Sequence, residues 1–178
     1  MGKATIICGT ADKNGVTQSM CSAASQYLKS VGFDSSIIYP CDLRIEHCRD
    51  CGACDHGRCV IDDDMHLIID EVSSSDLLVL STPIHFSGPS SVLKMVMDRF
   101  QPYWSDKESD RPSECILLMC GGSPEPRFEF TEKIVKAFCL MLGTEYLGSV
   151  SIPDTDSGMP DVKAIVDDRL AEIIKDRV

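Results

Sequence analysis

The stretch Asp76-Leu77-Leu78-Val79-Leu80-Ser81 is a continuous apolar run between two polar residues. A run of this kind is typical of a strand that is buried on both faces of a parallel sheet. Residues 82–90 follow as a loop of small, polar and aromatic residues, and a helix is expected from there to about Tyr103. The stretch therefore predicts a strand, a loop and a helix in succession, which is the repeating unit of a parallel α/β sheet.

The rest of the chain repeats this alternation of strand and helix. Between residues 16 and 31, apolar side chains recur at intervals of three and four, which indicates a helix with one buried face. Further patterns predict strands at residues 3–8, 33–39, 114–120 and 145–152, and helices from Asp62 onward, at 127–142 and at 161–177. Five strands then alternate with five helices. This predicts an α/β fold with a doubly wound five-stranded parallel sheet and helices on both faces.

Length and composition fit one domain that covers residues 1–178. The chain has 178 residues and 43% of them are hydrophobic, which is enough for a sizeable core. No apolar run reaches the roughly 20 residues that span a bilayer, and the first residues enter a strand without the hydrophobic segment of a signal peptide. We therefore expect a cytoplasmic protein. A net charge of −11 argues against binding to nucleic acids or anionic membranes.

Four cysteines stand close together in the stretch Cys48-Arg49-Asp50-Cys51-Gly52-Ala53-Cys54-Asp55-His56-Gly57-Arg58-Cys59, within a cysteine-rich loop at about residues 40–60. The spacing C-x2-C-x2-C-x4-C suits a chain that wraps around an iron–sulfur cluster. A structural zinc site usually pairs two C-x2-C steps across a longer spacer, which is absent here. Cys48, Cys51, Cys54 and Cys59 are therefore candidate metal ligands. Zinc, disulfides and an empty or redox-active thiol loop stay open as alternatives.

Charged residues after this loop are expected to have structural roles. The run Asp62–Asp64 opens a helix, where carboxylates favour the positive end of the helix dipole, so we interpret it as helix capping. Lys94, Asp98 and Arg99 lie on one later helix, and structural ion pairs or contacts at an interface are expected for them. The six cysteines outside the motif are expected to be small buried hydrophobic residues.

The loop after the first expected strand has the features of an anion site. It runs from Gly9 to the start of a helix, where free backbone N–H groups and the helix dipole favour a negative charge. Thr10, Asn14 and Thr17 add side-chain donors. The loop lacks the G-x-G-x-x-G and Walker A patterns, so a single phosphate is favoured over a dinucleotide pyrophosphate. An ordinary polar turn is the alternative.

Two later loops offer a site for a flat apolar ring. The loop after the third expected strand is apolar and aromatic, and its candidates for contact with a ring are Pro83, Ile84, His85, Phe86, Ser87 and Gly88. Gly121 and Gly122 follow the fourth strand and permit a close approach of the backbone to the same ligand. In a doubly wound sheet such loops meet at the carboxyl ends of the strands. A phosphate at one loop and a planar ring at two others describe a mononucleotide cofactor such as FMN.

Several of these motifs occur in an order that resembles a known family. Along nearly the whole chain, the following succeed one another: Gly9-Thr10, Asn14-Gly15 with Thr17, the cysteine stretch, Gly57 to Met65, Ser81 to Phe86, and Leu93-Lys94 with Asp98-Arg99. The ordered set is similar to the flavodoxin-like NAD(P)H-dependent FMN reductases, and more narrowly to the iron–sulfur flavoproteins of anaerobic microbes. The resemblance implies a flavodoxin-like fold with FMN at the strand ends.

The resemblance also implies a second cofactor and a set of partners. A [4Fe-4S] cluster is expected on the four cysteines of the motif, near a flavin that often belongs to a neighbouring subunit of a homodimer or homotetramer. Electrons are expected from a ferredoxin-like donor or NAD(P)H, and a small acceptor such as an oxygen species or a quinone is expected to receive them. Three positions depart from the family pattern. Asp12 stands where a cation is common, Val16 precedes Thr17 in place of the usual asparagine, and His85 stands in place of a tyrosine.

The leading interpretation is therefore an electron-transfer flavoprotein with FMN and a [4Fe-4S] cluster. The chain shows no Ser/His/Asp or Cys/His arrangement typical of nucleophilic catalysis, so the chemistry is assigned to the cofactors. A cluster-free NAD(P)H-dependent FMN or quinone reductase is the first alternative. A non-enzymatic thiol or metal-binding module on the same scaffold is the second, and the departures at Asp12 and Val16 keep it open.

Overall fold

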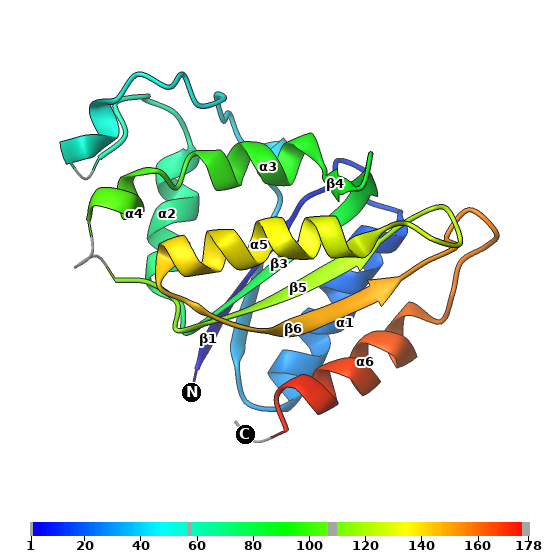
Figure 1. Cartoon of the computed structure of the whole chain (residues 1–178). Helices are drawn as coiled ribbons and strands as arrows, with labels where there is room; N and C mark the ends of the chain where they lie inside the picture. The colour runs from blue at the N-terminus through cyan, green and yellow to red at the C-terminus, as the bar shows by residue number, and fades with distance from the viewer. Residues whose placement is uncertain (1, 57, 107–109, 176–178) are drawn as a thin grey trace.

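The structure is a computed structural model that describes residues 2–56, 58–106 and 110–175. Its centre is a twisted parallel sheet with the strand order β2-β1-β3-β5-β6 (Figure 1). The strands are β1 (Lys3–Cys8), β2 (Asp34–Ile38), β3 (Leu77–His85), β5 (Glu114–Cys120) and β6 (Glu145–Ile152). The short β4 (Gly88–Pro89) pairs antiparallel with the end of β3. The predicted parallel sheet is confirmed, with six strands instead of five because of β4.

Helices cover both faces of the sheet, as predicted. One face packs against α1 (Val16–Ser30) and α6 (Val162–Ile173), and the other against α2 (Met65–Ser73), α3 (Ser91–Asp98) and α5 (Phe128–Leu142). Alternate residues of a strand face opposite layers, so Ile6 belongs to the first core and Ile7 to the second. Figure 1 shows α5 and α6 on opposite sides of β5 and β6. The continuous apolar runs of the central strands follow from this double burial.

Several predicted boundaries differ from the structure. The strand expected to end at Ser81 continues to His85, because Ile84 and His85 pair with β4. The helix expected to reach Tyr103 ends at Asp98, and the short α4 (Pro102–Ser105) follows it with a proline at its first position. The helix expected from Asp62 begins at Met65. The final helix, predicted over 161–177, also ends earlier, at Ile173, and residues 176 and 177 lie outside the described residues.

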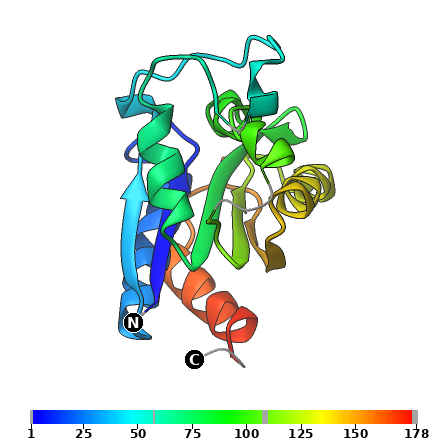
Figure 2. The ribbon, with the colours of Figure 1, turned by 90° about the vertical axis from the view of Figure 1, so that its left-hand side faces the viewer.

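Between β2 and α2 the chain makes a long excursion that contains the cysteine motif. It includes two short 3-10 turns, η1 (Pro40–Asp42) and η2 (Ala53–His56). Figure 2 shows this segment above the carboxyl edge of the sheet, with both ends of the chain at the opposite edge. In Figure 1 the part that carries the cysteine motif lies beside α2 and α4. Among the helices of the described residues, none is long and apolar enough to cross a membrane.

Candidate functional site

A cavity of about 590 Å³ opens at the carboxyl edge of the sheet, and we call it the edge cavity. Its size is typical of sites for small molecules and cofactors. It lies at the ends of β1, β3, β5 and β6, where a doubly wound sheet binds its ligands. The described residues that line it are Gly9, Thr10, Ala11, Asp12, Gly15, Val16, Thr17, Pro83, His85, Ser90, Ser91, Val92, Cys120, Thr155 and Met159.

Gly9 closes the junction between β1, β3 and α3. Its N–H donates to the carbonyl oxygen of Ser81 at 2.7 Å, and its carbonyl oxygen accepts from Oγ of Ser90 at 2.5 Å. A Cβ atom on Gly9 would lie 2.5 Å from the carbonyl oxygen of Ser81 and 2.8 Å from Cβ of Leu93. Packing between these elements therefore excludes a side chain at this position, whether or not a ligand is bound.

The first turn of α1 opens toward the edge cavity. Gly15 is its N-cap residue, and no side chain caps the helix with a hydrogen bond. Gly15, Val16 and Thr17 all line the cavity. Thr17 is held from below by β5, since its Oγ1 lies 3.1 Å from Sγ of Cys120. Helix N–H groups without a side-chain cap favour an anion at this end of the cavity.

A carboxylate stands at the same helix start. Oδ1 of Asp12 accepts a hydrogen bond from the N–H of Asn14 at 2.9 Å, and the N–H of Asp12 donates to Oγ1 of Thr10 at 3.1 Å. The neighbouring Lys13 instead pairs with Asp42, with 2.6 Å between Nζ and Oδ2. The described lining of the cavity thus contains Asp12 and neither lysine nor arginine. The negative charge of Asp12 opposes the attraction of the helix for an anion.

The end of β3 and β4 form a hairpin with two turn residues. Phe86 and Ser87 have φ angles of 51° and 64°, as a type I′ turn requires. These angles are uncommon for residues other than glycine, asparagine and aspartate. Oγ1 of Thr131 in α5 donates to the carbonyl oxygen of Ser87 at 3.2 Å, and Oγ1 of Thr82 accepts from the N–H of Ser90 at 2.9 Å. The hairpin is therefore fixed at its tip and its base, and the ring of Phe86 is fully exposed.

Gly121 and Gly122 join the loop after β5 to the loop after β6. The carbonyl oxygen of Gly121 accepts from the N–H of Thr155 at 3.1 Å, and that of Gly122 accepts from the N–H of Asp156 at 3.2 Å. A Cβ atom on Gly121 would overlap Pro126, and one on Gly122 would overlap the carboxylate of Asp156. The close approach at Gly121 is thus within the loop after β5, and that at Gly122 is to the loop after β6.

The structure brings some of the predicted cofactor residues to the edge cavity and leaves others outside it. Gly9, Thr10, Thr17, Pro83 and His85 line it. The predicted residues that are not among the described lining are Asn14, Ile84, Phe86, Ser87, Gly88, Gly121 and Gly122. Sequence reasoning missed Thr155 and Met159, which come from the loop after β6. A signal for them existed, because a further parallel strand also ends at this edge of the sheet.

None of the ten cysteines of the chain, including the four of the motif, forms a disulfide. Burial raises the pKa of the Cys54 thiol, and the charges of Cys59, Cys48 and Cys51 raise it further. The three other thiols are therefore close enough to Cys54 to interact with it electrostatically. Among the described residues, no three His, Cys, Asp or Glu side chains are gathered so tightly that they could hold a single metal ion. The chemistry of the donor set, four cysteines within twelve residues, is that of the ligands an iron–sulfur cluster takes.

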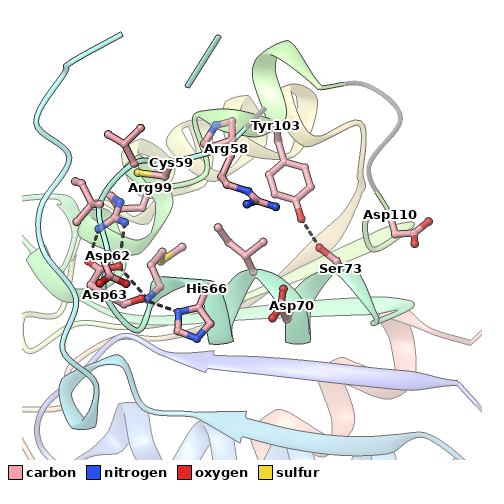
Figure 3. Close-up of a pocket in the computed structure, with 15 residues that line it drawn as sticks. Arg58, Cys59, Asp62, Asp63, His66, Asp70, Ser73, Arg99, Tyr103 and Asp110 are labelled. Atoms are coloured by element: carbon pink, nitrogen blue, oxygen red, sulfur yellow. Dashed lines mark hydrogen bonds and ion pairs between the residues drawn. The ribbon is translucent and has the colours of Figure 1, made fainter. Parts of the chain in front are cut away.

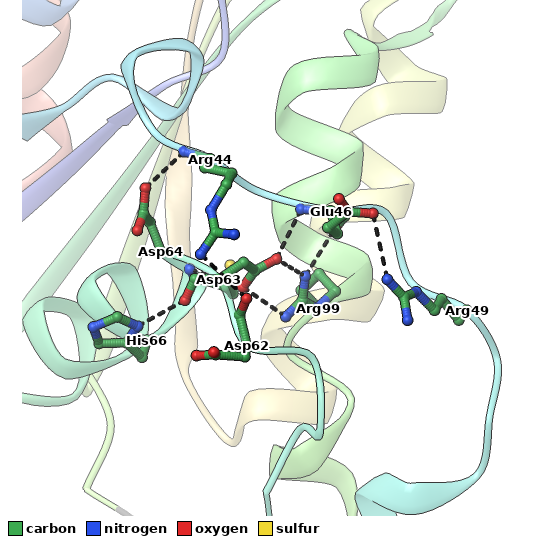
Figure 4. Close-up of polar contacts among 9 residues, drawn as sticks. Arg44, Glu46, Arg49, Asp62, Asp63, Asp64, His66 and Arg99 are labelled. Atoms are coloured by element: carbon green, nitrogen blue, oxygen red, sulfur yellow. Dashed lines mark hydrogen bonds and ion pairs between the residues drawn. The ribbon is translucent and has the colours of Figure 1, made fainter.

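The segments that enter and leave the cysteine loop run side by side (Figure 4). We call residues 44–46 and 62–64 the two legs, and residues 47–61 between them the cysteine loop. The N–H of Asp64 donates to the carbonyl oxygen of Arg44 at 2.9 Å, and the N–H of Arg44 donates to Oδ2 of Asp64 at 2.7 Å. The guanidinium of Arg44 also donates to the carbonyl oxygen of Asp62 at 3.3 Å. These bonds close the base of the loop.

A buried ion pair lies at this base. Arg99, which follows α3, forms a two-pronged contact with Asp63, with 2.6 Å from Nη1 to Oδ2 and 3.0 Å from Nη2 to Oδ1. Both side chains are almost fully buried, with exposed fractions of 2% and 1%. Asp63 also accepts from the N–H of Glu46 at 2.7 Å and from that of Met65 at 3.1 Å. Burial alone would raise the pKa of Asp63, but these bonds outweigh it and lower the pKa to about 2.

This pair corrects the interpretation of Asp62–Asp64 as helix-capping residues. Asp64 is the N-cap residue of α2, but its side chain makes no capping hydrogen bond. Only Asp63 contacts the first turn of α2, and its main partner is Arg99. The prediction of structural ion pairs on α3 is confirmed, because Lys94 pairs with Asp98 at 2.6 Å and Arg99 with Asp63.

A second cavity, of about 760 Å³, lies between the second leg of the cysteine loop, α2 and α4 (Figure 3). Cys59 and Arg99 belong to its wall, and the side chain of Arg58 extends into it. On the α2 side, the hydroxyl groups of Ser73 and Tyr103 are hydrogen-bonded. The fourth cysteine of the motif therefore faces an open space, and the buried guanidinium of Arg99 shares the same wall.

Comparison with known proteins identifies relatives along most of the chain. The family model described as NADPH-dependent FMN reductase matches residues 3–153. An iron–sulfur flavoprotein of Archaeoglobus fulgidus is 29% identical over 144 residues, which cover 76% of this chain and 63% of that protein. An iron–sulfur flavoprotein of Methanosarcina thermophila is 31% identical over 98 residues, which cover 54% of this chain and 51% of that protein. The chain thus spans less than two thirds of the length of these relatives.

Solved structures share the fold across the whole described chain. An NAD(P)H:quinone oxidoreductase from Methanothermobacter marburgensis superimposes with a TM-score of 0.75 at 14% identity, covering 99% of this chain and 97% of that one. An FMN-dependent NADH-azoreductase from Bacillus anthracis gives a TM-score of 0.68 at 16% identity, covering 98% of each chain. At such low identity the likeness establishes the fold alone.

Proposed function

Because the chain belongs to the NADPH-dependent FMN reductase family, we propose that it is an FMN-dependent oxidoreductase with its flavin in the edge cavity. The observation that carries this proposal is the meeting of two features in one space: the uncapped start of α1 and the end of β3. Thr10, Thr17 and the N–H groups of α1 would hold the phosphate. Pro83 and His85 would contact the ring, and the imidazole can stack or form a hydrogen bond. FMN, when bound, supplies hydride and single-electron transfer.

We further propose that Cys48, Cys51, Cys54 and Cys59 bind a [4Fe-4S] cluster. The four thiols come from one short stretch and form no disulfide, and the other three interact electrostatically with Cys54. The relatives from Archaeoglobus and Methanosarcina are both named iron–sulfur flavoproteins. Such a cluster supplies one-electron transfer when bound, at a potential set partly by charges and hydrogen bonds near its sulfur ligands. A ferredoxin-like protein or NAD(P)H is the proposed donor, and an oxygen species or a quinone the proposed acceptor.

The arrangement of the two sites favours electron transfer between subunits. In one chain the cysteine loop lies beside α4, whereas the edge cavity opens at the hairpin and the start of α1 (Figure 1). A homodimer or homotetramer can bring the cysteine loop of one chain to the edge cavity of another. We therefore propose a homo-oligomer as the working form.

A cluster-free NAD(P)H-dependent reductase is a second candidate. It is favoured by one observation, that the described residues hold no tight group of three metal-binding side chains. In this alternative the cysteine loop binds nothing, and NAD(P)H reduces the flavin directly.

The test is a visible absorption spectrum of protein purified without oxygen, with iron and acid-labile sulfide assayed on the same sample. We expect flavin bands with a broad iron–sulfur shoulder, and about four irons and four sulfides per chain. A flavin spectrum without iron would establish the cluster-free reductase. The absence of colour after incubation with FMN, iron and sulfide would refute both candidates.

Two serine variants make this test specific to the motif. Cys51→Ser removes one proposed ligand and should abolish the iron and sulfide while leaving the flavin content unchanged. Cys41→Ser is the matched control, because Cys41 is an exposed thiol that lies before the first leg of the loop. Equal loss of iron in both variants would show that the motif is not the site.

A further inference from the structure

We propose that Asp63 and Arg99 are positioning residues for the proposed metal ligands: the pair closes the base of the cysteine loop and fixes a positive charge beside Cys59. This inference rests on the proposed cluster, and it adds two residues outside the cysteine motif to that site. Asp63 comes from the second leg, and Arg99 follows α3.

The contacts of the pair reach both legs of the loop. Asp63 belongs to the second leg and accepts from the N–H of Glu46 in the first leg at 2.7 Å. Nη1 of Arg99 donates to the carbonyl oxygen of Glu46 at 2.7 Å, as well as to Asp63. The backbone of Glu46 is thus held at two atoms, its N–H by Asp63 and its carbonyl oxygen by Arg99. Glu46 lies two positions before Cys48, so this bond fixes the entry to the motif.

The same guanidinium lies beside the exit from the motif. Arg99 and Cys59 share the wall of the second cavity, and Figure 3 shows the sulfur of Cys59 next to Arg99. Nε of Arg99 is buried and has no hydrogen-bond partner among the described residues. Burial alone would lower the pKa of Arg99, but Asp63 and the nearby Cys59 raise it. A donor without a partner is costly in a buried site, and a thiolate ligand at Cys59 would give it one.

Stability alone is a weak explanation for this pair. A buried ion pair often contributes no more to stability than apolar side chains of the same volume, because both charges lose their hydration. The pair at 63 and 99 does what apolar residues could not: it bonds the backbone of the first leg and presents a charge to a cysteine. A positive charge near a sulfur ligand favours the more negative, reduced state of a cluster and so raises its reduction potential.

The first test uses hydrogen exchange of the apo-protein followed by NMR. The Glu46 N–H reports directly on the base of the loop, since its acceptor is Asp63. We expect Arg99→Gln to accelerate its exchange by about a hundredfold or more, because the carboxylate of Asp63 is then buried without its cation. Arg99→Lys keeps the charge but loses the two-pronged contact, so a smaller acceleration of about tenfold is expected. The exchange rates of the backbone N–H groups in β5 are measured on the same samples, and they report whether the whole protein stays folded.

Asp98→Asn is the matched control for this test. It removes a charge one position earlier on the same helix, where Lys94 and Asp98 are both exposed. We expect the exchange of the Glu46 N–H to be unchanged in this variant. If the Glu46 N–H exchanges in Arg99→Gln at the same rate as in Asp98→Asn, the pair does not close the base of the loop.

The second test measures the reduction potential of the loaded protein by a redox titration followed by electron paramagnetic resonance. We expect the potential to fall in Arg99→Gln, to stay near the wild-type value in Arg99→Lys and to be unchanged in Asp98→Asn. The charge at position 99 distinguishes these variants, because Arg99→Lys keeps it and Arg99→Gln removes it. Equal potentials in the wild-type protein and Arg99→Gln would refute the role of Arg99 toward Cys59.

The two tests separate this inference from the function on which it rests. If the wild-type chain binds no iron, the proposed cluster is refuted, and with it the role of Arg99 toward a ligand cysteine. If the wild-type chain binds its cluster and the variant potentials coincide, only the role of Arg99 is refuted. The exchange of the Glu46 N–H decides the closure of the loop in either case.

Discussion

Asp12 places a negative charge where the phosphate of FMN is proposed to bind. Replacing it by asparagine removes the charge and keeps a side-chain oxygen that can accept from the N–H of Asn14. We expect Asp12→Asn to tighten FMN binding by roughly three- to tenfold, because like charges at a partly exposed site repel by about 1 kcal/mol. The measurement is a fluorescence titration of the apo-protein with FMN, and the gain should shrink at high salt.

Riboflavin separates a charge effect from a change of shape, since it lacks the phosphate. Its affinity should not change in Asp12→Asn. Asp34→Asn serves as the matched variant, because Asp34 is exposed at the start of β2, at the opposite edge of the sheet. A gain of equal size for riboflavin would contradict the electrostatic explanation.

Asp63 couples stability to pH. Its pKa falls from 3.8 to about 2 in the folded protein. A depressed pKa means that the folded state binds the proton less readily than the unfolded state. The corresponding stabilisation, about 2.5 kcal/mol for a shift of about two units, is present above pH 3.8 and is lost as the pH falls toward 2. We expect urea unfolding to show a steep loss of stability across this window, and a shallower loss in Asp63→Asn.

At neutral pH, Asp63→Asn should lower the free energy of unfolding by about 3 kcal/mol, because Arg99 is then buried without the carboxylate of Asp63. Asp98→Asn disrupts the exposed Lys94–Asp98 pair and should change the free energy of unfolding by no more than about 0.5 kcal/mol. Similar losses in both variants would show that burial of the pair at Asp63 has no special energetic role.

At the scale of elements, the β3–β4 hairpin carries strain in its turn. Ser87 adopts a φ of 64°, which costs a residue with a side chain about 1 kcal/mol relative to glycine. We expect Ser87→Gly to raise the free energy of unfolding by about 0.5–1 kcal/mol. The bond from Thr131 to the carbonyl oxygen of Ser87 is retained, because it uses the backbone. Urea unfolding measures the change.

Gly143→Ala is the reverse experiment. Gly143 ends α5 with a φ of +74°, and a Cβ there would meet nothing closer than Arg111 at 3.8 Å. Gly143→Ala should therefore lower the free energy of unfolding by about 1 kcal/mol. The cause is the positive φ angle and not a clash with neighbouring atoms. If Ser87→Gly raises the free energy of unfolding but Gly143→Ala does not lower it, the cost of a side chain at positive φ does not explain the gain at Ser87.

The elements with one dominant local signal could be predicted from the sequence. The apolar runs of β3 and β5 are long enough to indicate burial on both faces, and the spacing in α1 indicates its inner face. The end of β3 could not be predicted in the same way. Ile84 and His85 look like loop residues, and they become strand only because β4 folds back on them.

The parts of the site that depend on distant contacts were beyond sequence reasoning. Asp63 stands before a helix, which is the usual place for a capping residue, and its partner Arg99 comes from another helix. Nothing in the local spacing joins them. Gly121 and Gly122 have the character of a ligand loop, but the atoms that exclude their side chains belong to Pro126 and Asp156. The cysteine motif is the opposite case, because the four proposed ligands are close together in the sequence.

At the scale of the whole molecule, the cysteine loop and the edge cavity are separate structures. The loop is supported by α4, α2 and the pair at Asp63 and Arg99, while the cavity is built by β1, the β3–β4 hairpin and the loops after β5 and β6. No described residue lines both the edge cavity and the second cavity beside Cys59. Loss of one cofactor should therefore leave the other site intact, and transfer between them should depend on assembly.

Mixed oligomers can test whether electrons cross from one chain to another. Cys51→Ser removes the proposed cluster, and Ser91→Trp fills the edge cavity from an exposed position at the start of α3. Each variant alone should lose the reduction of flavin through the cluster. When the two chains are assembled together as a dimer, half of the dimers are mixed, and each holds one intact cluster facing one intact flavin site. In a symmetric dimer this restores roughly a quarter of the wild-type transfer, measured by stopped-flow reduction of the flavin. Transfer within one chain predicts no recovery, because neither chain then carries both sites.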